Sequence, residues 1–363
     1  MKILIIKFKH IGDVLLSVPV LNALKSHYPD AQIDYLVFED TKDVVEFHTH
    51  VRHVFTVGRN EDNFSVLKTY LKIRKNKYDL TVDLSGGIDR GAIATLIIRG
   101  AKRIGAMPVN KHKSLRLKML VYTHLSEAPN VLAHSVMRDI SILNPLGIHI
   151  DSPLMDMHIP NDVIDKAKNL LVQFDISDNK KYILIHPTSR WLFKCIGDQA
   201  MAELVDRIPK EIGYKVILTC GPSKHELQRL QEITRYIESA PVIFPGNLEL
   251  MSLAGLIKYA ELFIGVDSAP AHISAALGVP TIAIFGPTGA YNWGPWPNQR
   301  DSTSPYPNQA GGIQRAGKHV VYQQQRHCMP CGKAGCDFSG ISDCLTSITA
   351  DEILVQIQQM IEH

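Results

Sequence analysis

Short apolar runs alternate with longer amphipathic segments along nearly the whole chain, in two successive series. The first series contains KILIIKF, IDYLVF, HVFTV and DLTVDL, and the second contains YILIHP, KVILTC, PVIFP, ELFIGV and PTIAIFGP. Between runs of the first series, residues 12–27 and 64–77 carry apolar side chains at helical spacing. Strands that alternate with helices predict parallel sheets covered by helices on both faces. The sequence therefore predicts an α/β protein built from two Rossmann-like halves.

The boundary between the halves is expected within residues 158–180, where a linker and a helix precede the strand that begins at Tyr182. We assign residues 1–165 to the first domain, 166–348 to the second and 349–363 to a final helix. Thr349 is the expected N-cap of that helix, and Asp351 and Glu352 occupy its first turn. Its apolar residues fall on one face, so the helix needs a surface on which to pack.

The amino-acid composition indicates a globular protein but does not indicate what kind of partner the protein binds. The 363 residues are 45% hydrophobic and 21% charged, as in globular proteins, and no apolar run reaches the length of a membrane span. The apolar run Ile3–Ile6 is too short for a signal peptide, because Lys7 and Lys9 interrupt it. A cytoplasmic location is expected. The net charge of +3 is small.

Basic residues gather locally after Lys102 and Arg103. The cluster contains Lys111, His112, Lys113, Arg116 and Lys118. One interpretation is a solvated face of a loop or helix. The other is a landing surface for an anionic acceptor or for phospholipid headgroups at the inner membrane. No nucleic-acid motif accompanies these charges, so nucleic acid is not expected as a partner.

The first strand-to-helix turn carries Gly12 and then Asp13. Asp13 has a structural interpretation, in which it caps the following helix. It also has a chemical one, because ligands of open parallel sheets bind outside the carboxyl ends of the strands. A carboxylate at that position can act as a general base toward an acceptor hydroxyl. The turn lacks the G-x-G-x-x-G fingerprint, which disfavours an NAD-dependent oxidoreductase.

Two turns of the second half carry groups suited to a phosphorylated ligand. Thr188 and Ser189 follow the strand YILIHP, and Lys194 lies shortly after them. Hydroxyls and a cation at a strand end suit a phosphate group, although a turn with one solvated lysine is equally consistent with the pattern. The turn after KVILTC places Glu226 where it can accept hydrogen bonds from ribose hydroxyls.

The most informative segment is ELFIGVDSAPAHISAALG. Its strand ends at Val266, and a helix of small residues begins directly afterwards. Small side chains at a helix start let a pyrophosphate approach the backbone N–H groups. The residues at this helix start are Asp267, Ser268, Ala269, Pro270, Ala271 and His272. Asp267 is placed to hold sugar hydroxyls, whereas His272 either donates to phosphate or packs as a core histidine.

These segments together resemble glycosyltransferase family 9, the ADP-heptose:lipopolysaccharide heptosyltransferases. The resemblance covers nearly the whole chain, through IGDVLLSVPVLNALK, YDLTVDLSGG, GAKRIGA, HPTS, IGVDSAPAHISAALG and FGPT in that order. It implies a GT-B fold, with the acceptor on the first domain and the nucleotide sugar mainly on the second. It also implies that the final helix crosses back to the first domain.

The resemblance further implies an inverting transfer of heptose from ADP-heptose to the inner core of lipopolysaccharide, without a catalytic metal. Asp13 matches the family's general base and Lys194 its phosphate-neutralising lysine. Thr188 and Ser189 match the hydroxyl pair near the diphosphate, Asp267 the residue that holds the heptose, and 268–272 the pyrophosphate-binding helix start. The chain departs from the family after Lys194, where Cys195-Ile196 replaces the usual x-Trp.

Four cysteines lie close together near the C-terminus: Cys328, Cys331, Cys336 and Cys344. Their spacing allows a structural zinc site of four thiolates. The second pair lacks the C-x₂-C form, however, so a loop of reduced cysteines is the other interpretation. Cys195 and Cys220 are expected to be ordinary buried thiols.

Two other classes of function stay open. A nucleotide-sugar epimerase of the same architecture acts on the donor alone and needs no lipid acceptor. A non-catalytic binding module leaves Asp13 without a chemical task. A transferase that uses another nucleotide sugar is a third alternative, since the contacts that read adenine and the sugar cannot be located in the sequence.

Overall fold

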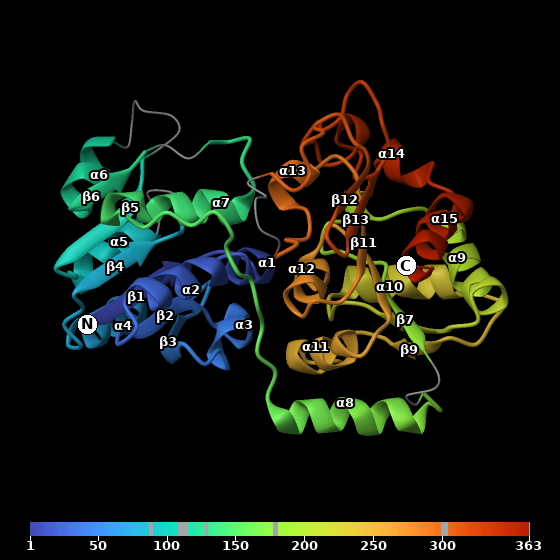
Figure 1. Cartoon of the computed structure of the whole chain (residues 1–363), viewed down its shortest axis with the longest axis horizontal. Coiled ribbons are helices and arrows are strands. Elements are labelled where there is room, and N and C mark those ends of the chain that lie inside the picture. The colour runs from blue at the N-terminus through green and yellow to red at the C-terminus, as the bar shows by residue number, and fades with distance from the viewer. Residues whose placement is uncertain (87–89, 108–114, 128–129, 177–180, 299–303, 363) are drawn as a thin grey trace. The chain divides into compact units, whose positions relative to one another are not determined.

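The computed structural model describes residues 1–86, 90–107, 115–127, 130–176, 181–298 and 304–362. The chain forms two compact units (Figure 1). Unit 1 comprises Met1–His158 together with Asn298, and unit 2 comprises Ile159–Pro297 and the chain from Ser304 onward. Each unit is built around one sheet of mainly parallel strands.

Unit 1 contains a six-stranded sheet in the order β3-β2-β1-β4-β5-β6, in which every pairing is parallel. This is the strand order of the classical dinucleotide-binding fold. The central strand, KILIIK, is buried along nearly its whole length, as its continuous apolar run predicts. The strands are β1 (Lys2–Lys7), β2 (Gln32–Phe38), β3 (Val51–Val57), β4 (Leu80–Asp83), β5 (Lys102–Ala106) and β6 (His124–Ser126).

Helices α4 and α5 of unit 1 pack on one face of this sheet. Val66, Tyr70 and Ile73 of α4 join Leu4 and Ile6 of β1 in one buried cluster. The helices of the unit are α1 (Ile11–Leu15), α2 (Val18–His27), α3 (Asp43–Glu46), α4 (Asn63–Arg74), α5 (Arg90–Ile98), α6 (Leu115–Val121) and α7 (Ser135–Ile140), with 3₁₀ turns at Glu39–Thr41 and Ser141–Leu146.

Unit 2 contains a seven-stranded sheet in the order β12-β13-β11-β10-β7-β8-β9. All pairings are parallel except β12 with β13 at one edge. Apart from that edge, the order repeats the arrangement of unit 1. The strands are β7 (Tyr182–His186), β8 (Lys215–Thr219), β9 (Val242–Phe244), β10 (Leu262–Val266), β11 (Thr281–Phe285), β12 (Gly312–Ala316) and β13 (His319–Gln323). The second Rossmann-like half is therefore confirmed.

The helices of unit 2 connect these strands. They are α8 (Asn161–Gln173), α9 (Asp198–Glu211), α10 (Lys224–Thr234), α11 (Leu250–Lys258), α12 (Ala269–Ala276), α13 (Ala290–Trp293), α14 (Asp343–Thr346) and α15 (Ala350–Ile361), with 3₁₀ turns at Leu192–Lys194 and Cys336–Phe338. None of the helices in the described ranges is both long and apolar enough to cross a membrane.

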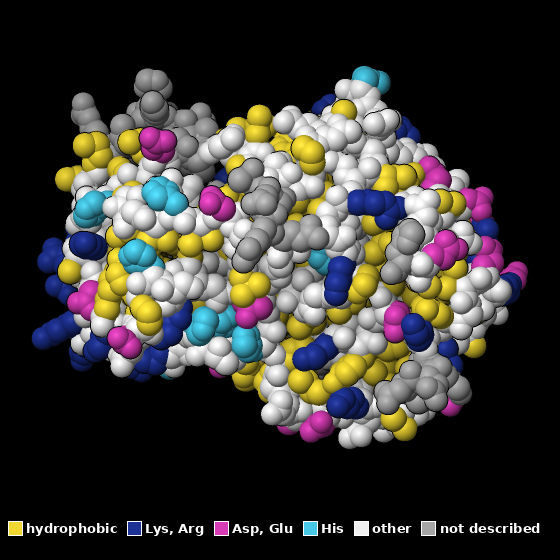
Figure 2. Space-filling model, viewed as in Figure 1, with side chains coloured by type: hydrophobic (Ala, Val, Ile, Leu, Met, Phe, Trp, Pro, Cys, Tyr) yellow, Lys and Arg dark blue, Asp and Glu magenta, His cyan; other side chains and the backbone are white. Residues whose placement is uncertain are grey.

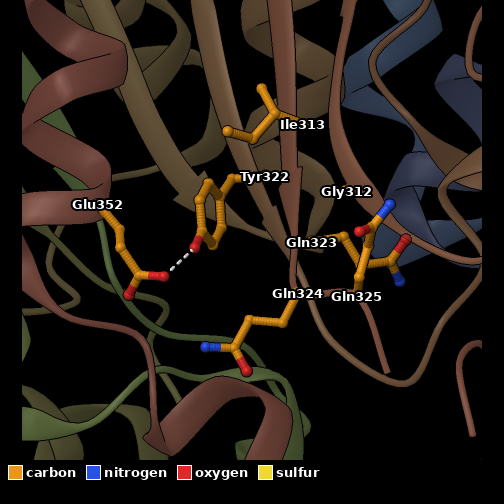
Figure 3. Close-up of a pocket in the computed structure, with 7 residues that line it drawn as sticks. All are labelled: Gly312, Ile313, Tyr322, Gln323, Gln324, Gln325 and Glu352. Atoms are coloured by element: carbon orange, nitrogen blue, oxygen red, sulfur yellow. Dashed lines mark hydrogen bonds between the residues drawn. The ribbon is translucent and has the colours of Figure 1, made fainter. Parts of the chain in front are cut away.

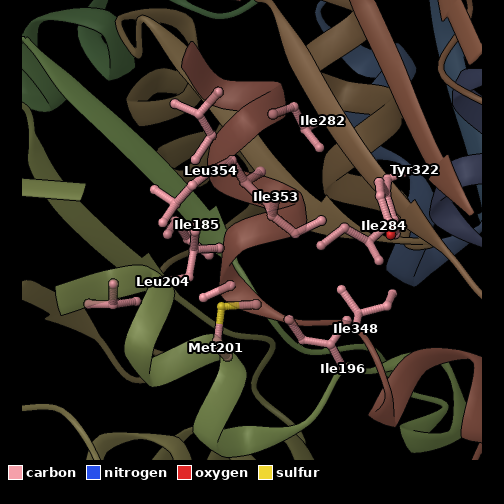
Figure 4. Packing of buried hydrophobic residues seen from close by; sticks show 14 of the residues in the cluster. Ile185, Ile196, Met201, Leu204, Ile282, Ile284, Tyr322, Ile348, Ile353 and Leu354 are labelled. Atoms are coloured by element: carbon pink, nitrogen blue, oxygen red, sulfur yellow. The ribbon is translucent and has the colours of Figure 1, made fainter. Parts of the chain in front are cut away.

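The final helix α15 packs on unit 2, and its expected return to the first domain stays a prediction. Ile353 and Leu354 lie in the same buried cluster as Met201 and Leu204 of α9 and Ile185 of β7 (Figure 4). Arg207 of α9 also forms an ion pair with Asp351. The apolar face of α15 is therefore covered, and its Asp351 is paired, by residues of unit 2.

The N-terminus of α15 has the expected cap, since Thr349 accepts from the N–H of Glu352.

The unit boundary falls between His158 and Ile159 rather than at residue 165. Helix α8 belongs entirely to unit 2, because it packs closely on α11. Gly255 of α11 permits this approach: a Cβ at that position would lie 3.0 Å from the Cβ of Ala167. The sequence predicts a helix here, but a helix next to a linker does not reveal the sheet on which it packs.

Candidate active site

The predicted site residues follow the strands that flank the topological switch point of each sheet. In unit 1 the switch point lies between β1 and β4, and in unit 2 between β7 and β10. Ligands of open α/β sheets bind at these points, outside the carboxyl ends of the strands. Asp13 follows β1, Thr188 and Ser189 follow β7, and Asp267 follows β10.

Asp13 lies in the first turn of α1, half-buried, and its carboxylate accepts from the backbone N–H of His10 at 3.3 Å. The capping interpretation of Asp13 is therefore correct as far as local structure goes. Capping uses one oxygen of the carboxylate and leaves the side chain partly accessible. The same residue can thus cap the helix and face an acceptor hydroxyl.

A buried ion pair lies near Asp13 and was missed in the sequence. Lys7, the last residue of β1, contacts Asp139 of α7 at 2.6 Å, and both side chains are at most 10% exposed. Burial raises the pKa of Asp139, Lys7 opposes that rise, and the charge of Asp13 adds to it. The sequence could have indicated this pair, because Lys7 ends an apolar strand and a buried lysine requires a partner of opposite charge.

Lys194 and Asp267 are brought together in unit 2, although 73 positions separate them. The Nζ of Lys194 lies 2.6 Å from Oδ2 of Asp267, and both side chains are largely buried, with 18% and 8% exposed. Cys195 and Ile196 are buried, and Ile196, at the position where the family usually has Trp, joins the core cluster of unit 2. Apolar packing of Ile196 therefore anchors the turn that carries Lys194.

Glu226 organises a second group of the predicted residues. It is buried and accepts from the hydroxyl of Thr188 at 3.2 Å and from the hydroxyl of Ser223 at 2.8 Å. Glycine at position 221 leaves room for this carboxylate, since a Cβ there would lie 2.5 Å from each carboxylate oxygen of Glu226. Ser189 is also buried, and its hydroxyl accepts from the N–H of Trp191. Hydrogen bonds and close packing thus connect Thr188, Glu226 and the turn at Gly221.

A buried histidine lies two residues before Thr188. His186 ends β7, and its Nδ1 lies 2.9 Å from the hydroxyl of Thr219 at the end of β8. Burial lowers the pKa of His186 to about 4, so the ring is neutral at ordinary pH. In the sequence, the position of His186 two residues before Thr188 could have indicated that it lies at the site.

Helix α12 begins with small residues, as predicted. Ser268 is its N-cap residue, but its hydroxyl donates to the carbonyl of Val266 and does not cap the helix. Ser268 and Ala269 are half-buried, whereas Pro270, Ala271 and His272 are buried. The approachable part of the helix start is therefore Ser268–Ala269, and the burial of His272 favours the core interpretation of that residue.

The basic cluster is smaller than predicted. Lys118 is buried, and its Nζ donates to the carbonyls of Ala106 at 2.9 Å and Gly86 at 3.1 Å, so its assignment to an acceptor or membrane surface is wrong. It instead joins α6 to the end of β5 and to the segment that follows β4. Lys111 and Lys113 lie outside the described residues, and only the backbone of Arg116, in α6, is described. Figure 2 shows basic and acidic side chains interspersed over the visible face.

The cysteines of the C-terminal cluster differ in burial. Cys328, Cys331 and Cys336 are exposed, whereas Cys344 is buried and burial raises its pKa to about 11. No three of these four described sulfur atoms lie within 4.8 Å of one another. The structural zinc site stays a prediction that the geometry does not support. Cys195 and Cys220 are buried thiols, as expected, and burial raises their pKa values to about 11 and about 12.

A separate hollow lies along the antiparallel edge of the unit 2 sheet (Figure 3). Tyr322 donates to Glu352 across it. The hollow is lined by Gly312, Ile313, Tyr322, Gln323, Gln324, Gln325 and Glu352. None of the predicted donor-binding residues lines it, so it is distinct from the switch-point site.

Comparison with known proteins decides the family. The model of "Glycosyltransferase family 9 (heptosyltransferase)" matches residues 66–316, well over half of the chain. The chain belongs to glycosyltransferase family 9. The family match includes Lys194, Glu226 and Asp267, whereas Asp13 precedes the matched range.

Individual members of the family agree with this assignment. Lipopolysaccharide heptosyltransferase 3 of Escherichia coli K12 is 34% identical over 291 residues, which cover 78% of this chain and 82% of that protein. Among solved structures, the family 9 transferase of Veillonella parvula aligns with a TM-score of 0.81 at 20% identity, over 100% of this chain and 97% of that one. E. coli ADP-heptose lps heptosyltransferase II aligns with a TM-score of 0.77 at 18% identity, over 99% and 98%. The chain therefore has the GT-B fold of the family's enzymes.

Proposed function

We propose that this glycosyltransferase moves heptose from ADP-heptose to the inner core of lipopolysaccharide, with inversion at the anomeric carbon. The observation that carries the proposal is the pairing of Lys194 with Asp267 at the switch point of unit 2. The names of its relatives support the choice of donor and acceptor, since the 34% identical protein is a lipopolysaccharide heptosyltransferase and E. coli heptosyltransferase WaaC has been solved with ADP.

The donor is proposed to bind unit 2. The diphosphate approaches Lys194 and the half-buried start of α12, where backbone dipoles favour negative charge. Asp267, already oriented by Lys194, accepts from heptose hydroxyls, and Glu226 can exchange its hydroxyl partners for those of the ribose. As the bond to ADP breaks, Lys194 offsets the charge that develops on the leaving diphosphate. That role requires no metal ion.

Asp13 is proposed as the general base. Its carboxylate removes the proton from the acceptor hydroxyl while that oxygen attacks the anomeric carbon from the face opposite ADP. Inversion follows from attack on that face. General-base catalysis by a positioned carboxylate contributes about 10²–10⁴-fold to the rate.

Contact with the inner membrane is proposed through α6 and the basic segment before it. Met119 and Leu120 of α6 are 63% and 75% exposed, and Lys111 and Lys113 precede this helix in the sequence. Apolar side chains next to basic ones suit the interface of an anionic membrane. Such a contact would hold the enzyme beside a lipid-anchored acceptor.

The test is to incubate the purified protein with ADP-heptose, with and without heptose-deficient lipopolysaccharide core, and to measure ADP release and acceptor mass. We expect ADP release that depends on the acceptor, an added heptose on the product, and activity that persists in EDTA. UDP-sugars serve as control donors. Consumption of ADP-heptose without acceptor would indicate an epimerase, and donor binding without any turnover would indicate a binding module.

A further inference from the structure

Two histidines and one aspartate gather in unit 1, where the chain leaves that unit. The Nε2 of His48 lies 3.2 Å from Oδ1 of Asp156, and the Nε2 of His158 lies 3.0 Å from Oδ2 of the same carboxylate. One potential ligand atom from each residue lies within 4.8 Å of the other two. The transfer mechanism uses none of these residues.

A second layer of polar groups holds this cluster in place. The side-chain amide of Asn22 donates to Oδ1 of Asp156 at 2.7 Å, and the Nδ1 of His50 lies 3.0 Å from Oδ1 of Asn22. The backbone N–H of His50 donates to Nδ1 of His48 at 3.1 Å, which directs Nε2 of that ring toward Asp156. These contacts, together with those of His48 and His158, fix the orientation of the Asp156 carboxylate.

We propose that His48, Asp156 and His158 bind one divalent first-row metal ion such as Zn²⁺. Two imidazole nitrogens and one carboxylate oxygen are ligands that Zn²⁺ and its neighbours accept, and three donors from the protein leave positions for water. His48 is buried, whereas the side chains of Asp156 and His158 are 32% and 34% exposed. The ion therefore has a path from solvent, and Asn22 supplies the supporting contact that oriented metal ligands require.

Metal binding rearranges the hydrogen bonds of the cluster. Where Nδ1 of His48 accepts from the N–H of His50, the ring proton of His48 lies on Nε2. Coordination through Nε2 moves this proton to Nδ1, so the bond from His50 gives way, as do the direct contacts of both imidazole Nε2 atoms with Asp156. Two histidine contacts and one carboxylate contact to the ion replace them. Affinity is accordingly expected to fall at low pH, since protons compete with the metal.

The ion would connect parts of unit 1 that are distant in sequence. His48 lies just before β3, and Asp156 and His158 lie at the end of the unit, where Asn298 also bonds to the backbone of Met155. The proposed role is structural: the ion holds the segment that contains Asp156 and His158 against the segment before β3 that contains His48. Binding should thus raise the thermal stability of the protein.

The experiment uses untagged full-length protein with Cys328→Ser and Cys331→Ser, so that the cysteine cluster does not compete for metal. After removal of metal by chelation, Zn²⁺ and Co²⁺ are titrated by calorimetry, and the Co²⁺ complex is examined by absorption. We expect one bound ion and no thiolate charge-transfer band. His158→Ala and His158→Gln should each weaken binding by at least about 10–100-fold, whereas exposed His149→Ala should leave it unchanged.

Each contrary result overturns the proposal. Absence of binding in the protein with intact histidines would do so, as would binding that survives both His158 variants. A thiolate band in the Co²⁺ spectrum would move the site to the remaining cysteines. Circular dichroism of each variant verifies that the fold is retained. These readouts do not depend on heptose transfer, so the metal proposal and the proposed function can fail independently.

Discussion

Lys194 carries the clearest prediction at the scale of single residues. Lys194→Met should lower kcat about 10²–10³-fold with ADP-heptose, because the group proposed to stabilise the leaving diphosphate is lost. Lys194→Arg keeps the charge and should retain more of the activity. Steady-state ADP release measures both variants, and Lys210→Met, an exposed lysine of α9, is the matched control. Equal activity of Lys194→Met and Lys210→Met would exclude the assigned role.

The Lys7–Asp139 pair predicts a pH-dependent loss of stability. Lys7→Met leaves a buried carboxylate without its partner, which should lower the free energy of unfolding by about 3–5 kcal/mol at neutral pH. Burial raises the pKa of Asp139, so the neutral carboxyl is tolerated at low pH. The deficit should therefore be small in acid and grow as the pH rises through the raised pKa. Urea unfolding at several pH values measures this, and a deficit independent of pH would contradict it.

Helix α15 is the element whose attachment to unit 2 can be tested directly. Ile353 is fully buried beside α9, whereas Val355, two positions later, is 45% exposed. Ile353→Ala should destabilise the protein by about 2–5 kcal/mol, and Val355→Ala should stay within about 0.5 kcal/mol of the parent. Denaturant unfolding compares the two variants. Similar effects of both would mean that α15 does not pack as described.

Two buried histidines predict the acid sensitivity of the unit 2 sheet. Burial lowers the pKa values of His186 in β7 and His319 in β13 to about 4, from an ordinary value of 6.5. The unfolded chain binds these protons first, so stability is lost as the pH falls from about 6.5 toward 4. Each histidine should account for roughly 2–4 kcal/mol, since one pKa unit corresponds to about 1.4 kcal/mol. His319→Gln should flatten the dependence measured by urea unfolding, whereas exposed His149→Gln should leave it unchanged.

For single helices and strands, the sequence patterns predicted where strands form better than they predicted the surface on which each helix packs. The strand KILIIK is apolar throughout, which specifies burial on both faces of a sheet. In contrast, α15 presents an apolar face that any apolar surface could cover, so its partner α9 could not be read from the chain. Lys118 shows the same limit for charge, because its burial depends on the carbonyls of Ala106 and Gly86 being close by.

For the whole molecule, two Rossmann-like sheets followed from repeated strand–helix alternation. The candidate site could be predicted in part because ligands bind at the carboxyl ends of parallel strands, which placed Asp13, Thr188 and Asp267 at switch points. Contacts such as Lys194–Asp267 or His48–Asp156 join residues more than 70 positions apart. Residue type and local spacing do not specify such pairs, and only folding brings them together.

In the proposed mechanism, unit 2 binds the donor and Asp13 of unit 1 removes the proton from the acceptor. The most direct measurement compares Asp13→Asn with the parent for two quantities, the Kd of ADP-heptose by calorimetry and the kcat of acceptor-dependent ADP release. Asp30→Asn, an exposed aspartate of unit 1, is the control. We expect kcat to fall about 10²–10⁴-fold while Kd stays unchanged. An unchanged kcat, or a Kd that weakens as much as kcat falls, would contradict the account.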